Sequence, residues 1–179
     1  MSIERLLLAV AFSSSVSALG TPRQMRLNFD FRVEEPRVLA QSIPDSTVMG
    51  AILKNPVNIR YSQSNSWKGQ IGKDRGFVEF DSYESGYRAA YILLKNYIGK
   101  HKRNTLSKIA YRFAPPSEND TEGYIADISK HSEVDPHKVL TTNDSEDIAR
   151  IIAAMTFRET SITVRWEDIH HLIINKWHN

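Results

Sequence analysis

The stretch Ser145-Glu146-Asp147-Ile148-Ala149-Arg150-Ile151-Ile152-Ala153-Ala154-Met155-Thr156-Phe157-Arg158-Glu159 indicates the fold that we expect for this chain. Its apolar residues Ile148, Ile151, Ile152 and Met155 recur at the spacing of one helical face, which predicts a buried helix over residues 145–158. Glu159 is the next residue on that face, since eleven positions at about 100° per residue return to within about 20° of the direction of Ile148. A carboxyl group therefore ends the apolar stripe.

A carboxyl group at the core-facing end of a buried helix has a chemical use. Burial disfavours the charged form and raises the pKa, so the group keeps its proton nearer to neutral pH, as a general acid requires. Glu159 is therefore the first candidate catalytic residue. The alternative is that the helix frays there, so that Glu159 is solvated or pairs with Arg158 or Arg165.

A second helix is predicted after Asp81 and Glu84, which have the spacing of a capping box. Its expected apolar face consists of Gly86, Ala89, Ala90, Leu93 and Tyr97. The small residues near its start would let this helix approach a neighbouring segment closely.

Two further helices are predicted between this one and residue 145. Asn104 or Thr105 can cap the first of them, and Pro115-Pro116 would stop it. Asn119 and Glu122 repeat the capping-box spacing before the second. Asp135-Pro136 would follow as a cap or a short turn.

The remaining predicted elements are two short strands and a closing helix. Residues 76–80 alternate apolar and polar side chains, and residues 162–164 form a second candidate strand. The closing helix has an apolar stripe of Trp166, Ile169, Ile173 and Trp177. The predicted fold class is mainly α (α+β), a helical domain with a small β element over residues 51–179.

The first 50 residues are expected to lie outside this helical domain. Residues 1–18 carry a short apolar run followed by small residues, an order that resembles a bacterial secretory signal, with a core helix or a tail as the alternative. The run is too short to cross a bilayer, so we expect no stable membrane insertion. Residues 19–50 contain three prolines without a sustained period and are predicted to be irregular, with one short helix near residues 37–41.

Composition excludes several classes of function. The 179 residues have a formal net charge of +2, without the basic excess of a dedicated nucleic-acid binder, so no nucleic-acid partner is expected. The absence of cysteine rules out thiolate catalysis and cysteine-based metal sites. The six histidines show no ligand spacing, and no phosphate-binding loop or serine-hydrolase elbow is present, so we expect neither a metal nor a cofactor.

A second carboxylate is available between the two prolines and the following helix. Ser117-Glu118-Asn119-Asp120-Thr121 supplies oxygen atoms that can cap free backbone N–H groups. Alternatively, Glu118 or Asp120 faces a cleft and acts as the partner of Glu159 in a glycosidase pair. The sequence leaves both interpretations open.

Aromatic and polar residues gather in the segment that contains the first predicted strand and the helix after it. Aromatic rings stack on sugar faces, and Asn and Arg side chains bind hydroxyl, acetamido or carboxylate groups. The candidate substrate-binding residues of a glycan groove are Asn58, Arg60, Tyr61, Trp67, Phe77 and Tyr87. An ordinary aromatic core is the alternative.

Several motifs resemble a phage and prophage family of virion structural proteins over residues 52–160. They are Asn55-Pro56-Val57-Asn58-Ile59-Arg60, Trp67-Lys68-Gly69, Gly76-Phe77-Val78-Glu79-Phe80-Asp81-Ser82, Gly86-Tyr87-Arg88-Ala89 and Arg112-Phe113-Ala114-Pro115-Pro116-Ser117-Glu118-Asn119-Asp120-Thr121. The chain departs from the family pattern at Val57, where the family has Gly, and at Glu159-Thr160-Ser161, where it has Glu-Asn-Gly.

A more distant similarity is to the flagellar-type glucosaminidases of the lysozyme-like superfamily. In those enzymes a catalytic Glu ends a helix and is followed by segments similar to residues 55–90 of this chain, which here have no such helix before them. The resemblance implies a circularly permuted lysozyme-like fold, in which residues 145–158 take the place of that first helix and bring Glu159 beside Asn58, Trp67 and Phe77.

The resemblance implies three functions. The first is an exported or phage-associated glycosidase that cleaves the glycan strands of peptidoglycan by hydrolysis or by lytic transglycosylation. The second is a virion structural or cell-wall-binding protein without catalysis, which would have a virion partner. The third is an antibacterial effector acting in the periplasm, which would have an immunity protein as partner.

Overall fold

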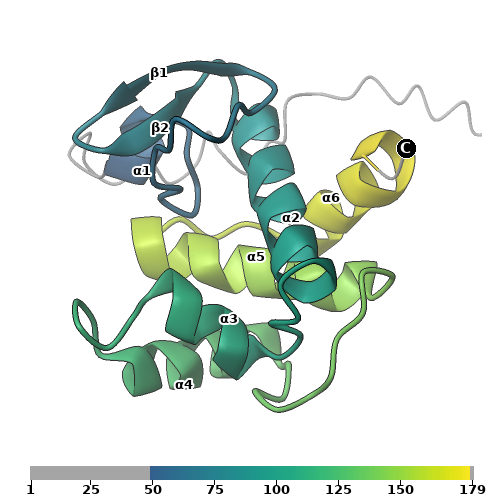
Figure 1. Cartoon of the computed structure of the whole chain (residues 1–179). Coiled ribbons are helices and arrows are strands. Elements are labelled where there is room, and N and C mark those ends of the chain that lie inside the picture. Colours follow the sequence, from purple (N-terminus) through teal and green to yellow (C-terminus); the bar gives the residue numbers. More distant parts are fainter. Residues whose placement is uncertain (1–48, 178–179) are drawn as a thin grey trace, which may run out of the picture. The chain divides into compact units, whose positions relative to one another are not determined.

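The computed structural model describes residues 49–177 (Figure 1). Its helices are α1 (Met49–Ile52), α2 (Tyr83–Gly99), α3 (Leu106–Phe113), α4 (Thr121–Ser132), α5 (Ser145–Thr160) and α6 (Trp166–Leu172), the last continuing into a π-helical turn (Ile173–Trp177). The strands β1 (Gln70–Asp74) and β2 (Phe77–Phe80) form one antiparallel sheet. The predicted mainly α (α+β) class is confirmed. The predictions for residues 1–18 and 37–41 lie outside the described residues, as does the predicted irregular segment 19–50 up to residue 48; its last two residues, Met49 and Gly50, belong to α1.

Helix α5 runs through the core of this domain. All four apolar residues of its predicted stripe are at most 2% exposed, and the helix packs against α1, α2, α4 and α6 (Figure 1). It continues two residues past the predicted end, so Glu159 lies in its last turn. Ser161 then adopts the left-handed conformation (φ 58°) and donates its backbone N–H to the Phe157 carbonyl, which ends the helix.

The sheet is a hairpin with one predicted and one unpredicted strand. The prediction of a strand at residues 76–80 is confirmed by β2, whose alternate residues Val78 and Phe80 are buried. Asp74 pairs with Phe77 across a two-residue turn in which Arg75 (φ 47°) and Gly76 (φ 86°) both have positive φ. Positive φ at both positions matches the right-handed twist of a hairpin.

The start of α2 lies close to the loop that follows α1. Ser82, not the predicted Asp81, is the N-cap, and its hydroxyl accepts a hydrogen bond of 3.2 Å from the Ser85 backbone N–H. A Cβ added to Gly86 would overlap the Lys54 carbonyl oxygen and lie 2.7 Å from Pro56 Cδ. The predicted close approach at this end of α2 is therefore confirmed.

Helices α3 and α4 were predicted, with one cap displaced. The Thr105 hydroxyl caps α3 by accepting from the Lys108 backbone N–H at 3.2 Å. Asp120, not Asn119, caps α4 by accepting from Gly123 at 3.0 Å. Asp135-Pro136 forms a turn, in which the Asp135 side chain accepts from the His137 N–H.

The C-terminal part of the domain differs from the prediction in one element. Residues 162–164 form no strand; they are an extended connection whose Ile162 and Val164 point inward and are buried. The alternation of a strand is present there, but no neighbouring strand pairs with it. The closing helix is confirmed by α6 and the π-helical turn, with Ile169, Ile173 and Trp177 buried.

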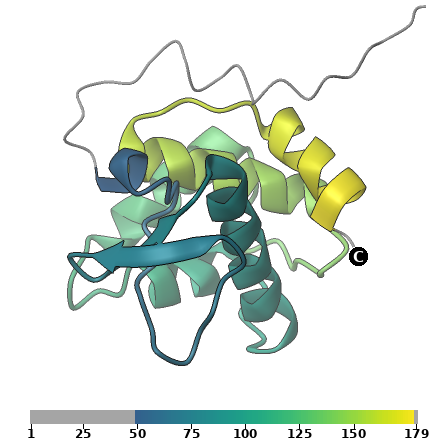
Figure 2. The same ribbon diagram turned by 90° about the horizontal axis from the view of Figure 1, so that it is seen from above.

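Seen from above, the hairpin lies across α2 and beside the end of α5, with α6 at the opposite end of the helical layer (Figure 2). Segments far apart in the chain thereby meet at the C-terminal end of α5. Among residues 49–177, no helix has both the length and the apolar character needed to cross a bilayer.

Candidate active site

A buried asparagine fixes the loop that forms one side of the site. The Asn55 side chain is fully buried and donates to the carbonyl oxygens of Ile59 (3.0 Å) and Val78 (2.9 Å), while its own oxygen accepts from the Ile59 N–H (2.8 Å). Arg60 then pairs with Phe77 as an isolated antiparallel bridge. These contacts hold residues 55–61 against β2 and leave few conformations open to the loop.

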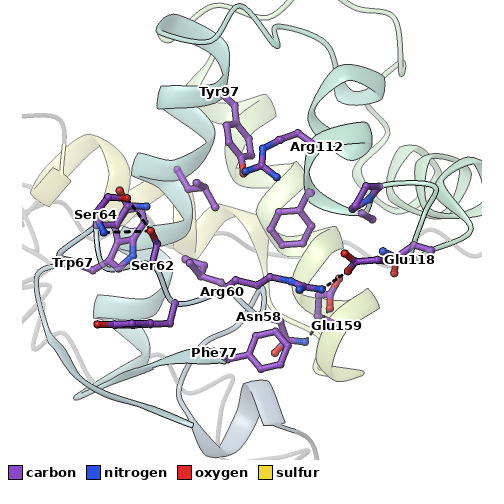
Figure 3. Close-up of a pocket in the computed structure, with 18 residues that line it drawn as sticks. Asn58, Arg60, Ser62, Ser64, Trp67, Phe77, Tyr97, Arg112, Glu118 and Glu159 are labelled. Carbon is purple, nitrogen blue, oxygen red and sulfur yellow. Dashed lines mark hydrogen bonds and ion pairs between the residues drawn. The ribbon is translucent and has the colours of Figure 1, made fainter. Parts of the chain in front are cut away.

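Asn58 projects from this loop toward the end of α5. Its backbone has a φ of 51°, a left-handed conformation that asparagine tolerates better than most residues. The Asn58 amide nitrogen donates a hydrogen bond of 2.9 Å to the Glu159 carboxyl group. Two residues 101 positions apart are thereby joined at the bottom of one pocket (Figure 3).

The electrostatic surroundings of Glu159 favour its protonated form. The side chain is half-buried, and this loss of hydration raises the pKa of Glu159 above its ordinary value. The hydrogen bond from Asn58, the nearby Tyr124 hydroxyl and the charge of Arg158 lower the pKa of Glu159 but do not cancel the effect of burial. The group therefore holds its proton at a higher pH than a solvated glutamate.

The ion-pairing alternative for Glu159 is not what the structure shows. Arg158 pairs with Asp127 at 3.3 Å, and Arg165 lies 3.7 Å from Glu167. Both guanidinium groups have carboxylates of their own, and the Glu159 side chain points into the pocket instead (Figure 3).

The buried hydroxyl group of Tyr124 lies near the Glu159 carboxyl group. It forms no hydrogen bond of ordinary length among the described residues, but it is close enough to Glu159 for the two groups to influence each other. Burial and the nearby carboxyl group together raise the pKa of Tyr124 well above its ordinary value. A neutral phenol therefore faces the acid throughout the physiological pH range.

The pocket beside Glu159 has a volume of about 560 Å³, a size typical of small-molecule and oligosaccharide sites. Aromatic side chains and short polar loops make up most of its wall (Figure 3). The predicted residues that line it are Asn58, Arg60, Tyr61, Trp67, Phe77, Glu118 and Glu159.

Glu118 is the predicted partner carboxylate that the structure brings to this pocket. It lies in the loop between α3 and α4, and its carboxylate accepts a hydrogen bond of 2.6 Å from the Arg60 guanidinium. The pair connects two walls of the pocket, because Arg60 lies in the loop after α1 and Glu118 lies in the loop between α3 and α4 (Figure 3). Both side chains are at least half exposed, so the pair contributes little to stability.

Two predicted site residues lie elsewhere. Asp120 does not line the pocket, because its carboxylate is engaged at the N-terminus of α4. Tyr87 is 2% exposed and belongs to the core face of α2, where it packs in the hydrophobic core instead of facing a ligand. For these two residues the capping and core interpretations describe the observed positions.

Sequence reasoning missed the wall formed by α2 and α3. Its side chains are Leu93, Tyr97, Arg112 and Phe113. Leu93 and Tyr97 belong to the predicted apolar face of α2, but they are only half-buried because the C-terminal half of this face lines the pocket. The signal that could have revealed Arg112 is its place at the start of the motif that contains Glu118.

Within residues 49–177, no three His, Asp or Glu side chains are grouped so that they could hold a metal ion. The chemical groups that line the pocket are the carboxyl groups of Glu159 and Glu118, the guanidinium groups of Arg60 and Arg112, and several aromatic surfaces.

The chain is similar to a phage protein. It is 32% identical over 105 residues to Protein P5 of Pseudoalteromonas phage PM2, in an alignment that covers 56% of this chain and 64% of the phage protein. The chain thus spans less than two thirds of that relative's length. No model of a known protein family matches the chain.

Proposed function

We propose that this protein is a phage-associated glycosidase that cleaves the glycan strands of peptidoglycan, with Glu159 as its general acid. The observation that carries the proposal is the half-buried Glu159 carboxyl group at the floor of a pocket lined by Asn58 and Trp67. Because burial raises the pKa of Glu159, the group retains its proton to a higher pH than a solvated glutamate, which is the direction that a general acid requires.

The proposed reaction begins with glycan bound against the aromatic wall of the pocket, which consists of Tyr61, Trp67, Phe77, Tyr97 and Phe113. Glu159 protonates the glycosidic oxygen, the bond between that oxygen and the anomeric carbon breaks, and positive charge develops on the sugar. Water, or a hydroxyl group of the same sugar, then adds to the anomeric carbon and returns a proton to Glu159. Addition of water gives hydrolysis, and addition of the sugar hydroxyl gives lytic transglycosylation.

Glu118 is the candidate for the second carboxylate, because it lines the same pocket as Glu159. It would stabilise positive charge on the sugar or accept the proton of the attacking water. Its pairing with Arg60 means that the substrate must share or displace the guanidinium before Glu118 can act. Asp120 has no part in the proposed reaction because it caps α4.

The order of the elements supports the hypothesis of a circularly permuted lysozyme-like fold. The hairpin and the loop that carries Asn58 precede α5 in the chain, whereas the resemblance to flagellar-type glucosaminidases has the acid-bearing helix first. Despite this order, Glu159 contacts Asn58 directly. Such a rearrangement keeps a site intact when the original chain ends lie close together.

The decisive experiment measures the release of soluble fragments from purified peptidoglycan by the wild type, Glu159→Gln and Glu167→Gln. We expect Glu159→Gln to lose at least about 100-fold in rate, the typical contribution of a general acid. Glu167→Gln is the matched control, because Glu167 lies half-exposed on α6 with only a surface contact to Arg165. Equal rates for the wild type and Glu159→Gln would remove the acid from the mechanism.

The products distinguish the two reaction types. Mass spectrometry of the fragments would reveal a new reducing end after hydrolysis and, after transglycosylation, a terminal sugar closed by an intramolecular anhydro bond. We expect Glu118→Gln to slow hydrolysis strongly, whereas transglycosylation by the sugar's own hydroxyl depends less on this carboxylate.

A second candidate function, a non-catalytic virion or cell-wall-binding protein, is favoured by the similarity to a phage protein. It predicts that the wild type and Glu159→Gln both sediment with peptidoglycan and that neither releases soluble fragments. Release by the wild type alone would exclude it.

A further inference from the structure

The charged groups around the pocket are unequally paired. Two guanidinium groups and two carboxyl groups line it, those of Arg60, Arg112, Glu118 and Glu159. Arg60 is engaged with Glu118 at 2.6 Å. Glu159 is uncharged in the protonated form that an acid catalyst requires. The Arg112 guanidinium therefore remains as a positive charge without a carboxylate partner among the described residues.

Arg112 is a solvent-exposed residue in the wall of the pocket, where Tyr97 lies close to it. It lies in the last turn of α3, where the helix dipole favours a cation. Figure 3 shows its guanidinium beside the Tyr97 side chain, which comes from α2, with both groups directed into the pocket. Partial burial raises the pKa of Tyr97, against the opposing charges of Arg112 and Arg103, so its hydroxyl stays neutral and can donate a hydrogen bond.

A planar guanidinium next to a phenolic O–H presents several donors and a positive charge to one region of space. A carboxylate is the group that matches such an arrangement, because it can accept two parallel N–H bonds from arginine and a further bond from the phenol. The hydroxyl and acetamido groups of a neutral sugar carry no charge to match the arginine.

We propose that Arg112 and Tyr97 form a subsite for a carboxylate carried by the glycan, and so make the pocket select acidic over neutral polysaccharides. This inference rests on the proposed function and deepens it. In peptidoglycan the carboxylate is supplied by the lactyl group of N-acetylmuramic acid or by the attached peptide. Chitin has the same sugar backbone spacing and carries neither group.

The test measures binding to the protein with Glu159→Gln, which prevents turnover. Three oligosaccharides are titrated by calorimetry: chitotetraose, the tetrasaccharide of alternating N-acetylglucosamine and N-acetylmuramic acid, and the same tetrasaccharide with a short peptide on each lactyl group. We expect at least one acidic tetrasaccharide to bind about tenfold more tightly than chitotetraose, a typical effect of one charge-assisted contact. Preference for the unsubstituted form identifies the lactyl carboxylate, and preference for the substituted form identifies the peptide carboxylate.

Two substitutions of Arg112, each added to the Glu159→Gln protein, test whether this residue causes the preference for acidic saccharides. Arg112→Met should bring the affinity ratio to about one, whereas Arg112→Lys should keep part of it because a point charge remains. Arg103→Met is the matched control, since Arg103 also acts on Tyr97 but does not line the pocket, and it should leave the ratio unchanged. Circular dichroism would establish that each variant is folded.

A ratio near one before substitution, or a tenfold ratio that survives Arg112→Met, would overturn the inference while leaving the glycosidase proposal standing. Failure to bind any of the three saccharides, together with no fragment release by the wild type, would overturn both. Release of fragments from chitin and peptidoglycan at equal rates would overturn the subsite alone.

Discussion

The side-chain nitrogen of Asn58 lies 2.9 Å from the carboxyl oxygen of Glu159, although 101 positions separate the two residues in the chain. This bond ties the loop after α1 to the last turn of α5. Because it stabilises the charged carboxylate, it sets how far burial can raise the pKa of Glu159. The acid is thus tuned by a residue from the opposite end of the described domain.

Removing the Asn58 amide should raise the pKa of Glu159 further. In Asn58→Gly the left-handed backbone is retained, but the donor that favours the ionised carboxylate is lost. Carbon-detected NMR titration of the Glu159 side chain would measure the change. If the protein is the proposed glycosidase, the alkaline limb of its pH–rate profile should move upward with the pKa. An unchanged pKa would show that the hydrogen bond has no influence on the acid.

Replacing Glu159 should stabilise the protein at neutral pH. A carboxyl group whose pKa is raised in the folded state binds more protons there than in the unfolded state, so its contribution to stability falls as the pH rises from the ordinary glutamate value through the raised value. Glu159→Gln removes this loss and keeps an acceptor for Asn58. We expect its melting temperature to exceed that of the wild type at pH 8, with a smaller difference at pH 4. Glu167→Gln serves as the exposed control, and a difference that grows toward low pH would contradict this account.

Gly86→Ala should strongly destabilise the domain. The new methyl group would collide with the backbone at Lys54 and with Pro56, where rigid atoms cannot move aside, and such overpacking costs about 1–3 kcal/mol. Gly99→Ala is the matched control in the same helix, since its methyl group would meet only the Thr142 side chain at 3.1 Å. Urea denaturation should show a large loss for the first variant and a change within about 1 kcal/mol for the second. Similar losses in both would argue against the close approach at Gly86.

Asp120 should matter for stability and not for the proposed chemistry. Asp120→Ala removes the side chain that caps α4, which costs about 1 kcal/mol, whereas Asp120→Asn keeps an acceptor for the Gly123 N–H. Thermal unfolding should separate the two variants. Both should release peptidoglycan fragments at wild-type rates at temperatures where they are folded. A loss of rate in Asp120→Asn, without a loss of stability, would return Asp120 to the list of catalytic candidates.

The helices could be predicted because their apolar residues repeat with the period of the helix itself. The stripe from Ile148 to Met155 is the clearest example, and it also gave the direction of Glu159. The start of a helix is harder to place, because neighbouring residues compete as caps. Ser82 caps α2 in place of the adjacent candidate Asp81, and Asp120 caps α4 in place of Asn119.

Strand β1 could not be predicted from its own residues. Among the five residues Gln70–Asp74, Ile71 is a large apolar residue, and it is 64% exposed. The strand exists because β2 and the Arg75-Gly76 turn bring a partner to it. The opposite case is Ile162 and Val164, which alternate like a strand but have no partner.

A residue of the candidate site could be predicted where the apolar stripe of its own helix shows which way the side chain points. It could not be predicted where the packing of two helices determines whether the side chain lines the pocket. Tyr87 and Tyr97 both lie on α2, yet the first packs in the core and the second lines the pocket. Ten positions at about 100° per residue turn the two side chains about 80° apart on α2, but which of these two directions meets the core and which meets a pocket depends on the other segments packed against the helix. The role of Arg112 likewise cannot be predicted from its spacing in the sequence. Whether an arginine has a carboxylate partner depends on which carboxylates other segments bring near it.

The late position of the acid in the chain has a consequence for synthesis. While α5 is still inside the ribosome, the emerging polypeptide already contains the aromatic wall and Asn58 but lacks the carboxyl group they surround. A nascent or prematurely terminated polypeptide that ends before residue 159 therefore lacks the carboxyl group of Glu159 and cannot form the complete pocket. Any activity that depends on Glu159 begins only after residue 159 has been made and α5 has folded.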